Sequence, residues 1–353
     1  MVDLFYKLKA LQQQGISIHL HCFTNGRPPQ DELNKYCVEV NYYQRIKNSS
    51  SVSWKLPLIV KSRASEELLQ NLQRDNYPIL LEGIHCSYFL YTGQLAGRKV
   101  ILRLHNVEFE YYRHLAKHEN NFFKRLYFVN ESRLLKSYEH VIAGKATIVT
   151  VSKEDADLYE EQFSAKDIHQ LPVFIPWTMA AGKEGTGTFC LYHGNLSVNE
   201  NEKAAIWLLQ NVFNDTDIAF VIAGKDPSKR LMRIANTNKN TCLIANPSET
   251  EMQDLISKAQ VNVLPSFNNT GVKLKLLNAL FNGRHCLVNP AAVAGSGLEL
   301  ACRIANEEEE FKEVLAHLYK ESFTNDEIEK RQGLLQRQFN NEANAKQLIT
   351  WLW

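Results

Sequence analysis

The sequence lacks the features that mark membrane-spanning, disulfide-bonded and nucleic-acid-binding proteins. No apolar run approaches the roughly 20 residues of a membrane-spanning helix, and the N-terminus shows no secretory pattern. The 7 cysteines form no Cys-x-x-Cys pair and no metal-ligand spacing, which is typical of reduced thiols and predicts a cytoplasmic location. Lysine and arginine (40) nearly balance the acidic residues (39), with a net charge of +1, so we expect no nucleic-acid partner.

The order of segments along the chain predicts an α/β protein. A length of 353 residues with 44% hydrophobic content suffices for two domain cores. Strand-like and helix-like segments alternate, which predicts parallel sheets with helical crossovers. We expect one domain in residues 1–175, a glycine-rich linker at 176–188 and a second domain at 189–336. The first domain opens with an amphipathic helix, so the strand and glycine turn that normally open such a domain are missing from its pattern.

A mixed aromatic and basic segment at 109–129 has a helical pattern, with a further helix at 131–144. One interpretation is a helix that rests on a membrane surface through its aromatic and basic side chains. The alternative is a helix with one face in the core and a solvated basic face.

Two strand ends in the first half carry polar residues. A predicted strand at 78–82 is followed by Gly83 and His85, and a strand at 99–104 runs into His105, Asn106 and Glu108. Open α/β sheets bind ligands beyond the carboxyl ends of their strands. A histidine there can take a proton from a hydroxyl near neutral pH, although a structural histidine bonded to loop backbone fits the same position.

The stretch 259–283 has the order strand, polar loop, helix. The strand covers 261–264, and Gly271 opens a helix that carries Lys273 and Lys275 in its first turn and ends at Gly283. Lysines there oppose the helix dipole, which favours anions at this end. They therefore indicate either a bound anionic ligand or two solvated side chains on a surface helix.

Three further strand ends of the second half carry Gly194, Lys225 and Asn246. In a parallel sheet these ends share one edge with the loop at Gly271. We expect Lys225, Lys273 and Lys275 to converge there on one anionic ligand. A nucleoside diphosphate is the natural candidate, and three cations neutralise it without a metal.

These segments resemble the nucleotide-sugar-binding half of GT-B fold glycosyltransferases of the family 4 and family 1 type. The resemblance covers 189–297 well and the first domain loosely. It implies two Rossmann-like domains that face across a cleft, with a C-terminal helix at 337–353 crossing back to the N-terminal domain. It is carried by Tyr192-His193-Gly194-Asn195-Leu196, Val221-Ile222-Ala223-Gly224-Lys225, Leu264-Pro265-Ser266, Gly271, Lys273-Leu274-Lys275-Leu276-Leu277 and, in the first domain, Arg103-Leu104-His105-Asn106.

The resemblance implies transfer of a sugar, with retention of configuration, from a nucleoside diphosphate sugar to an acceptor hydroxyl. The acceptor would be a carbohydrate or a lipid-linked carbohydrate in polysaccharide or glycolipid synthesis. The resemblance implies no metal cofactor. The protein would act in the cytoplasm or at the inner face of the membrane. His105, Lys225 and Lys273 would be catalytic. The acceptor side would hold His85, Asn106 and Glu108, and the donor side Gly194, Asn195, Lys225, Asn246, Thr270, Gly271, Lys273, Lys275 and Asn278.

Two positions depart from the family pattern. The family often has two glutamates around this helix, where this sequence has Thr270 and Asn278. An asparagine still bonds a hydroxyl but brings no charge. Two alternatives therefore stay open: a nucleotide-sugar-binding protein without catalysis, and an epimerase of a nucleotide sugar.

Overall fold

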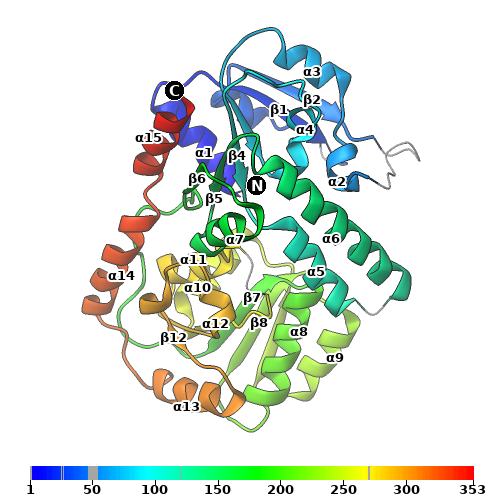
Figure 1. The fold of residues 1–353 in the computed structure, drawn as a ribbon. Coiled ribbons are helices and arrows are strands. Elements are labelled where there is room, and N and C mark those ends of the chain that lie inside the picture. Colours follow the sequence, from blue (N-terminus) through cyan, green and yellow to red (C-terminus); the bar gives the residue numbers. More distant parts are fainter. Residues whose placement is uncertain (1, 25, 27, 47–54, 120, 269–270) are drawn as a thin grey trace. The chain divides into compact units, whose positions relative to one another are not determined.

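The computed structural model describes residues 2–24, 26, 28–46, 55–119, 121–268 and 271–353 (Figure 1). The chain forms two compact units. Unit 1 comprises Met1–Pro176 together with Phe339–Trp353, and unit 2 comprises Trp177–Gln338. The backbone therefore passes between the units twice.

Unit 1 contains two parallel sheets. Strands β1 (His19–Thr24) and β2 (Glu39–Gln44) form a two-stranded sheet. Strands β3 (Ile79–Glu82), β4 (Val100–Leu104), β5 (Thr147–Thr150) and β6 (Ile168–Gln170) form a four-stranded sheet in that order. Every residue of β4 and β5 is buried, as expected for central strands covered on both faces.

The side chains of β4 alternate between two cores. Ile101 packs with α1 (Val2–Gln13) and α15 (Asn341–Leu352) on one face of the sheet. Leu102 and Leu104 point to the other face and join the core that includes residues of α6 (Phe122–Ile142) and α7 (Lys153–Phe163). The remaining helices of unit 1 are α2 (Leu58–Lys61), α3 (Glu66–Leu72), α4 (Tyr88–Tyr91) and α5 (Glu108–His118), with 3-10 turns at Asp31–Lys35 and Ile84–Cys86.

Unit 2 contains one six-stranded parallel sheet in the order β12-β11-β10-β7-β8-β9. Its helices are α8 (Asn199–Trp207), α9 (Lys229–Thr237), α10 (Glu249–Lys258), α11 (Leu274–Asn282), α12 (Pro290–Val293), α13 (Glu308–Leu318) and α14 (Asn325–Gln338). The predicted α/β fold with parallel sheets is confirmed. The strands are β7 (Cys190–Asn195), β8 (Phe220–Lys225), β9 (Thr241–Ala245), β10 (Val261–Val263), β11 (His285–Val288) and β12 (Arg303–Ile304).

The predicted helix at 109–129 is wrong in its bounds. Helix α5 ends at His118, and α6 runs without interruption from Phe122 to Ile142. The break falls at Asn121, whose side chain accepts a hydrogen bond from the backbone N–H of Lys124 at 3.1 Å. This N-cap satisfies a donor that would otherwise have no intrahelical partner, so it starts a new helix.

The glycine-rich segment that follows Pro176 packs onto unit 2. The backbone N–H of Ala181 donates to Phe281, and Gly185 exchanges two backbone hydrogen bonds with Phe323. A side chain at Gly187 would collide with the backbone of 258–260. Throughout the described residues, no helix has the length and apolar character needed to cross a membrane.

Candidate functional site

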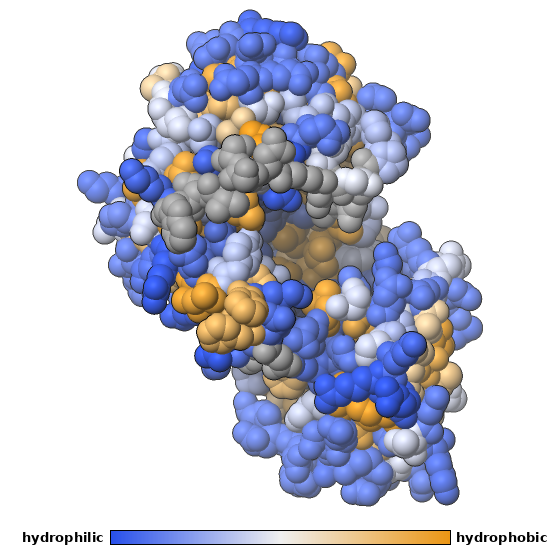
Figure 2. Space-filling model, turned by 90° about the vertical axis from the view of Figure 1, so that its right-hand side faces the viewer, coloured by the Kyte–Doolittle hydropathy of each residue, from blue (hydrophilic) through white to orange (hydrophobic). Residues whose placement is uncertain are grey.

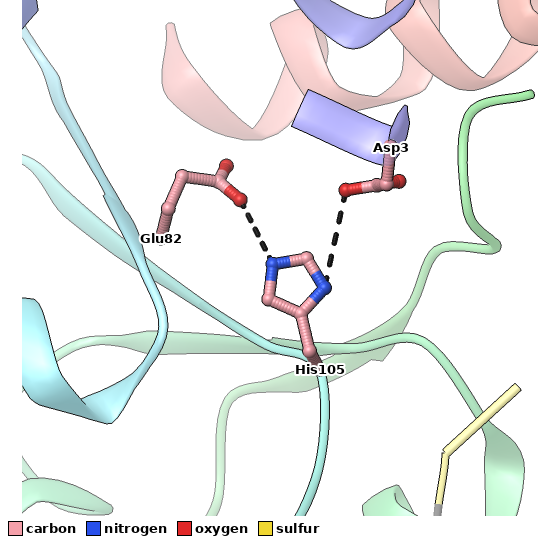
Figure 3. Close-up of side chains that lie close together, drawn as sticks. All are labelled: Asp3, Glu82 and His105. Atoms are coloured by element: carbon pink, nitrogen blue, oxygen red, sulfur yellow. Dashed lines mark hydrogen bonds and ion pairs between the residues drawn. The ribbon is translucent and has the colours of Figure 1, made fainter. Parts of the chain in front are cut away.

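Side chains from three elements of unit 1 meet at the carboxyl end of its four-stranded sheet (Figure 3). His105, just after β4, lies between two carboxylates. Its Nε2 is 3.1 Å from Oε2 of Glu82 at the end of β3, and its Nδ1 is 3.9 Å from Oδ2 of Asp3 in α1. The side chain of His105 is 35% exposed, so its ring lies beside both carboxylates and is still accessible from solvent.

Two buried cations balance the two carboxylates. Lys7 Nζ lies 2.5 Å from Glu82 Oε1, and Arg103 contacts Asp3 through both terminal nitrogens, at 2.5 and 3.1 Å. Burial alone would raise the pKa of each carboxyl, but these cations outweigh it. They lower the pKa of Glu82 to about 2 and hold that of Asp3 below its usual range, so both groups are ionised at neutral pH.

The same carboxylates and imidazole have ligand atoms within 4.8 Å of one another. The set does not fit a metal ion well, because the oxygens already bind Lys7 and Arg103. Two negative and two positive charges cancel, and a divalent ion would add uncompensated charge in a buried place. The arrangement instead suits a histidine fixed in orientation by its neighbours.

His85 and Glu108, both predicted for the acceptor side, lie half-buried at the same edge. The ring of His85 covers Gly83 closely enough that a Cβ there would collide with it. Burial, and then the charge of Arg63, lower the pKa of His85 to about 3, so the ring is neutral. Burial raises the pKa of Glu108 to about 7, which makes it an acid–base group near neutral pH. Asn106 lies half-buried between His105 and the start of α5.

Glu139 of α6 fixes the backbone of this turn. Its fully buried carboxyl group, whose pKa burial raises to about 8, accepts hydrogen bonds from the N–H groups of Glu108 at 3.0 Å and Phe109 at 3.1 Å. The hydroxyl of Tyr159 donates to it at 2.9 Å. It therefore caps α5 and holds the segment that begins at His105.

In unit 2, the ends of β7 and β8 bring Asn195 and Lys225 side by side in register. A side chain at Gly224 would collide with the carbonyl oxygen of Gly194, so glycine is required where the strands approach this closely. Both Asn195 and Lys225 are exposed. The carbonyl of Asn195 accepts from Asn201 Nδ2 at 3.0 Å.

Lys275 lies in the first turn of α11, and Lys273 is its N-cap residue. The Lys275 ammonium donates to Asn201 Oδ1 at 3.1 Å and to the hydroxyl of Tyr192 at 3.2 Å, and it lies 4.7 Å from the centre of the Tyr192 ring. Burial, and then the charge of Lys273, lower its pKa to about 8. Asn201 bonds both Lys275 and the carbonyl of Asn195 at the end of β7. Lys275 therefore lies at the same edge of the unit 2 sheet as Lys225.

The other residues predicted for the donor differ in their contacts. Asn246 adopts the left-handed conformation (φ 52°) at the end of β9, and its Oδ1 accepts from the N–H of Asp226 at 2.8 Å. Asn278 accepts from Asn282 within α11 at 2.8 Å. Gly271 is buried with φ 64°, and Thr270 lies outside the described residues.

Sequence reasoning missed the side chains that support these groups. Arg103 is a charge in an otherwise apolar strand, which by itself indicates a buried partner. Asp3 and Lys7 lie one helical turn apart in α1. The sequence around them does not show that this side of the helix packs against β4, so neither residue could be recognised as part of the site. Tyr192 and Asn201 belong to a segment that resembled the family, but only their contact with Lys275 reveals what they hold.

Residues 187–321 match the family model for glycosyl transferases group 1. A relative from Klebsiella pneumoniae, described as an uncharacterized 44.6 kDa protein in the cps region, is 26% identical over 317 residues. The match covers 84% of this chain and 80% of that protein.

Two solved structures have a similar fold. HepE of Anabaena, in complex with UDP and glucose, has a TM-score of 0.68 at 10% identity over 99% of this chain and 95% of its own. TarM of S. aureus has a TM-score of 0.58 at 12% identity over 80% of this chain. This chain spans only 57% of TarM. The chain therefore has the GT-B fold of glycosyltransferases, and the resemblance predicted from the sequence is confirmed.

Proposed function

We propose that this protein transfers a sugar from a nucleoside diphosphate sugar to an acceptor hydroxyl, with retention of configuration. The observation that carries the proposal is the ammonium of Lys275. It is half-buried at the start of α11 and is held by two neutral groups. Among the described residues, Lys275 forms no ion pair with a carboxylate, whereas six other lysines do.

The donor's diphosphate would bind at the unit 2 edge. Lys275 and Lys225, with Lys273 beside them, would stabilise the negative charge that grows on the leaving diphosphate. Backbone groups at Gly194 and Gly271 and the amides of Asn195, Asn246 and Asn278 would bind the rest of the nucleotide sugar. The three lysines supply the charge in this proposal, and no metal is included.

In the transfer, the bond from the anomeric carbon to the diphosphate breaks and a bond from that carbon to the acceptor oxygen forms. The acceptor proton leaves with the diphosphate or passes to a protein group. His105 is the proposed group that contacts the reacting sugar or hydroxyl, because Glu82 and Asp3 fix its ring. His85, Asn106 and Glu108 would contact the acceptor.

The biological setting is part of the proposal. The Klebsiella pneumoniae relative is described as lying in a cps region, which supports a role in polysaccharide or glycolipid synthesis with a carbohydrate or lipid-linked acceptor. The UDP in the HepE complex makes a uridine nucleotide the first donor to test. The cysteine pattern supports a cytoplasmic site of action.

A thermal-shift screen of UDP-, GDP- and ADP-linked sugars identifies the donor, because a ligand bound only by the folded form raises Tm. Mass spectrometry of nucleoside diphosphate released in the presence of acceptors then tests transfer. Lys275→Ala should reduce release at least tenfold, whereas exposed Lys239→Ala serves as the matched control. Equal release from both variants and the parent would remove the assigned role of Lys275.

The same experiment separates a binding protein from an enzyme. The uncharged Asn278, whose amide bonds Asn282, is the observation that favours binding without catalysis. A donor that raises Tm without any release, with all acceptors offered, would support that alternative. Conversion of the donor to another nucleotide sugar would reveal an epimerase.

Contact with a membrane surface is a further part of the proposal. At the start of α6, Phe122, Phe123 and Leu126 are exposed by 71%, 80% and 58%, and the side view of the molecule in Figure 2 shows hydrophobic groups gathered among hydrophilic ones. A depression beside them is lined by Arg113, His114, Ala116, Lys117, Arg125 and Val129. Apolar side chains flanked by basic ones suit an anionic lipid surface.

Vesicle flotation tests this contact. The protein should float with phosphatidylglycerol-containing vesicles and less with pure phosphatidylcholine. Replacing Phe122 and Phe123 by Ser should abolish flotation and leave Tm unchanged, since both rings are exposed. Flotation of that double variant at the parent level would contradict the assigned surface.

A further inference from the structure

Two arginines are anchored to one short helix at the edge of unit 1. Arg45 follows β2, and its Nη2 donates to Ser62 Oγ at 3.0 Å. Arg63 Nη1 donates to the carbonyl of Ile59 at 2.5 Å. Ile59 lies in α2 and Ser62 is its C-cap residue, so the same turn of α2 fixes both guanidinium groups. Both side chains are half-buried.

This pair lies next to the groups proposed for the acceptor. Helix α2 packs against the turn Ile84–Cys86, which follows β3 and contains His85. The charge of Arg63 acts on His85, where it adds to the effect of burial, and on Glu108, where it opposes that effect. The arginines thus lie at the strand ends that carry the acceptor-side residues.

Among the residues that the structure describes, neither arginine forms an ion pair with an acidic side chain, and Glu108 acts on Arg63 only through its charge. The arginine ion pairs among the residues that the structure describes involve Arg98, Arg103, Arg113 and Arg303. Two half-buried cations close together raise the free energy of the folded state unless an anion neutralises them. Guanidinium groups match the oxygens of phosphate in geometry as well as in charge, and a phosphate dianion balances two of them.

We propose that Arg45 and Arg63 bind a phosphate group on the acceptor substrate. The proposal rests on the proposed sugar transfer, because it names the chemical class of the acceptor. The phosphate belongs either to a free sugar phosphate or to a lipid phosphate, and the two sources share the same recognition chemistry.

Calorimetric binding to the full chain distinguishes these sources. The probes are glucose 1-phosphate with glucose as its neutral control, and undecyl phosphate with undecanol in neutral detergent micelles. The variants are Arg45→Gln and Arg63→Gln, with exposed Arg74→Gln as the matched control. All three substitutions lie in unit 1. Any phosphate that binds to unit 2 therefore contributes equally to the binding measured for the parent and for each variant.

The parent should bind one phosphorylated probe and not its neutral counterpart, and each glutamine variant at 45 or 63 should weaken that binding about tenfold or more. The probe affected identifies the source. Equal affinity in all variants, or no binding of either phosphorylated probe to the parent, would overturn the proposal. If Arg63→Gln does not fold, binding to Arg45→Gln alone tests the proposal. That variant is expected to fold, because it loses only the hydrogen bond from Arg45 to the Ser62 hydroxyl. This experiment measures binding and does not depend on nucleoside diphosphate release. A failure of the proposed sugar transfer, which the release assay tests, can therefore be distinguished from a failure of the phosphate site.

Discussion

Lys275 shows how a single residue combines two opposing requirements. Its ammonium must keep its charge to bind a diphosphate, yet burial lowers its pKa from 10.5 to about 8. Asn201 and Tyr192 offset part of that cost by accepting hydrogen bonds from it. The result is a cation whose charge is available to an anionic ligand and depends on pH in the working range.

We therefore predict that affinity for the nucleoside diphosphate falls as the pH rises through about 8. The folded-state pKa is depressed, so below 8 the ammonium is charged and above 8 it becomes neutral. Lys275→Arg should keep the affinity high and flatten its pH dependence, because guanidinium stays protonated. Calorimetric titration between pH 6.5 and 9.5 measures this, and an unchanged pH profile in the arginine variant would contradict it.

His105 depends on a positioning residue, Glu82, at 3.1 Å. His105→Ala should lower kcat by about 100-fold or more with little change in donor affinity, since the proposed donor site lies in unit 2. Glu82→Gln should lower kcat less and shift the pH optimum, because a neutral amide replaces the carboxylate beside the imidazole. Steady-state kinetics over a pH range measures both effects. Equal losses of kcat and donor affinity would indicate a structural role only.

At the residue scale, the sequence was informative where chemistry and position coincide. His105, Glu108 and Lys225 could be picked out as candidates because each lies at the end of an apolar strand or shortly after it, and their roles stay predictions. Asp3 could not, since its partner Arg103 is 100 residues away. A pairing across that separation depends on how α1 packs, which local pattern does not encode.

At the scale of elements, Glu139 joins three segments: α6, the start of α5 and α7. Glu139→Ala should destabilise the protein by about 3 kcal/mol, because two backbone N–H groups and the Tyr159 hydroxyl lose their acceptor in a buried place. Urea unfolding measures this. Exposed Glu154→Ala, in the same unit, is the control and should leave the unfolding free energy nearly unchanged.

Most elements could be predicted within a few residues, since their capping residues are visible in the sequence. Ser152 and Ser248 each accept a hydrogen bond from the residue three positions on, as their sequences indicate. The break at Asn121 was missed because aromatic and basic residues continue the helical pattern on both sides. Strand β6 was missed because only Ile168 of its three residues is apolar and all three are partly exposed.

At the scale of the whole molecule, the C-terminal helix contributes to the core of unit 1. Leu348 is fully buried against the face that includes Ile101 and Phe174. Leu348→Ala should destabilise unit 1 by about 3 kcal/mol and leave the donor-induced stabilisation of unit 2 intact. Calorimetric unfolding with and without nucleotide measures both. Loss of nucleotide binding in a variant that is still folded would contradict the assignment of α15 to unit 1.

Because the backbone crosses between the units twice, one compact body is encoded by two separate stretches of the gene. An expression plasmid whose coding sequence ends at codon 176 would produce unit 1 without α15, which would uncover part of the apolar surface around Ile101 and Val149 and favour aggregation. Reordering the gene so that 339–353 precede 2–176 through a flexible tether would restore that covering in a single polypeptide. Such a circularly permuted half would allow acceptor recognition to be studied by NMR at a manageable size.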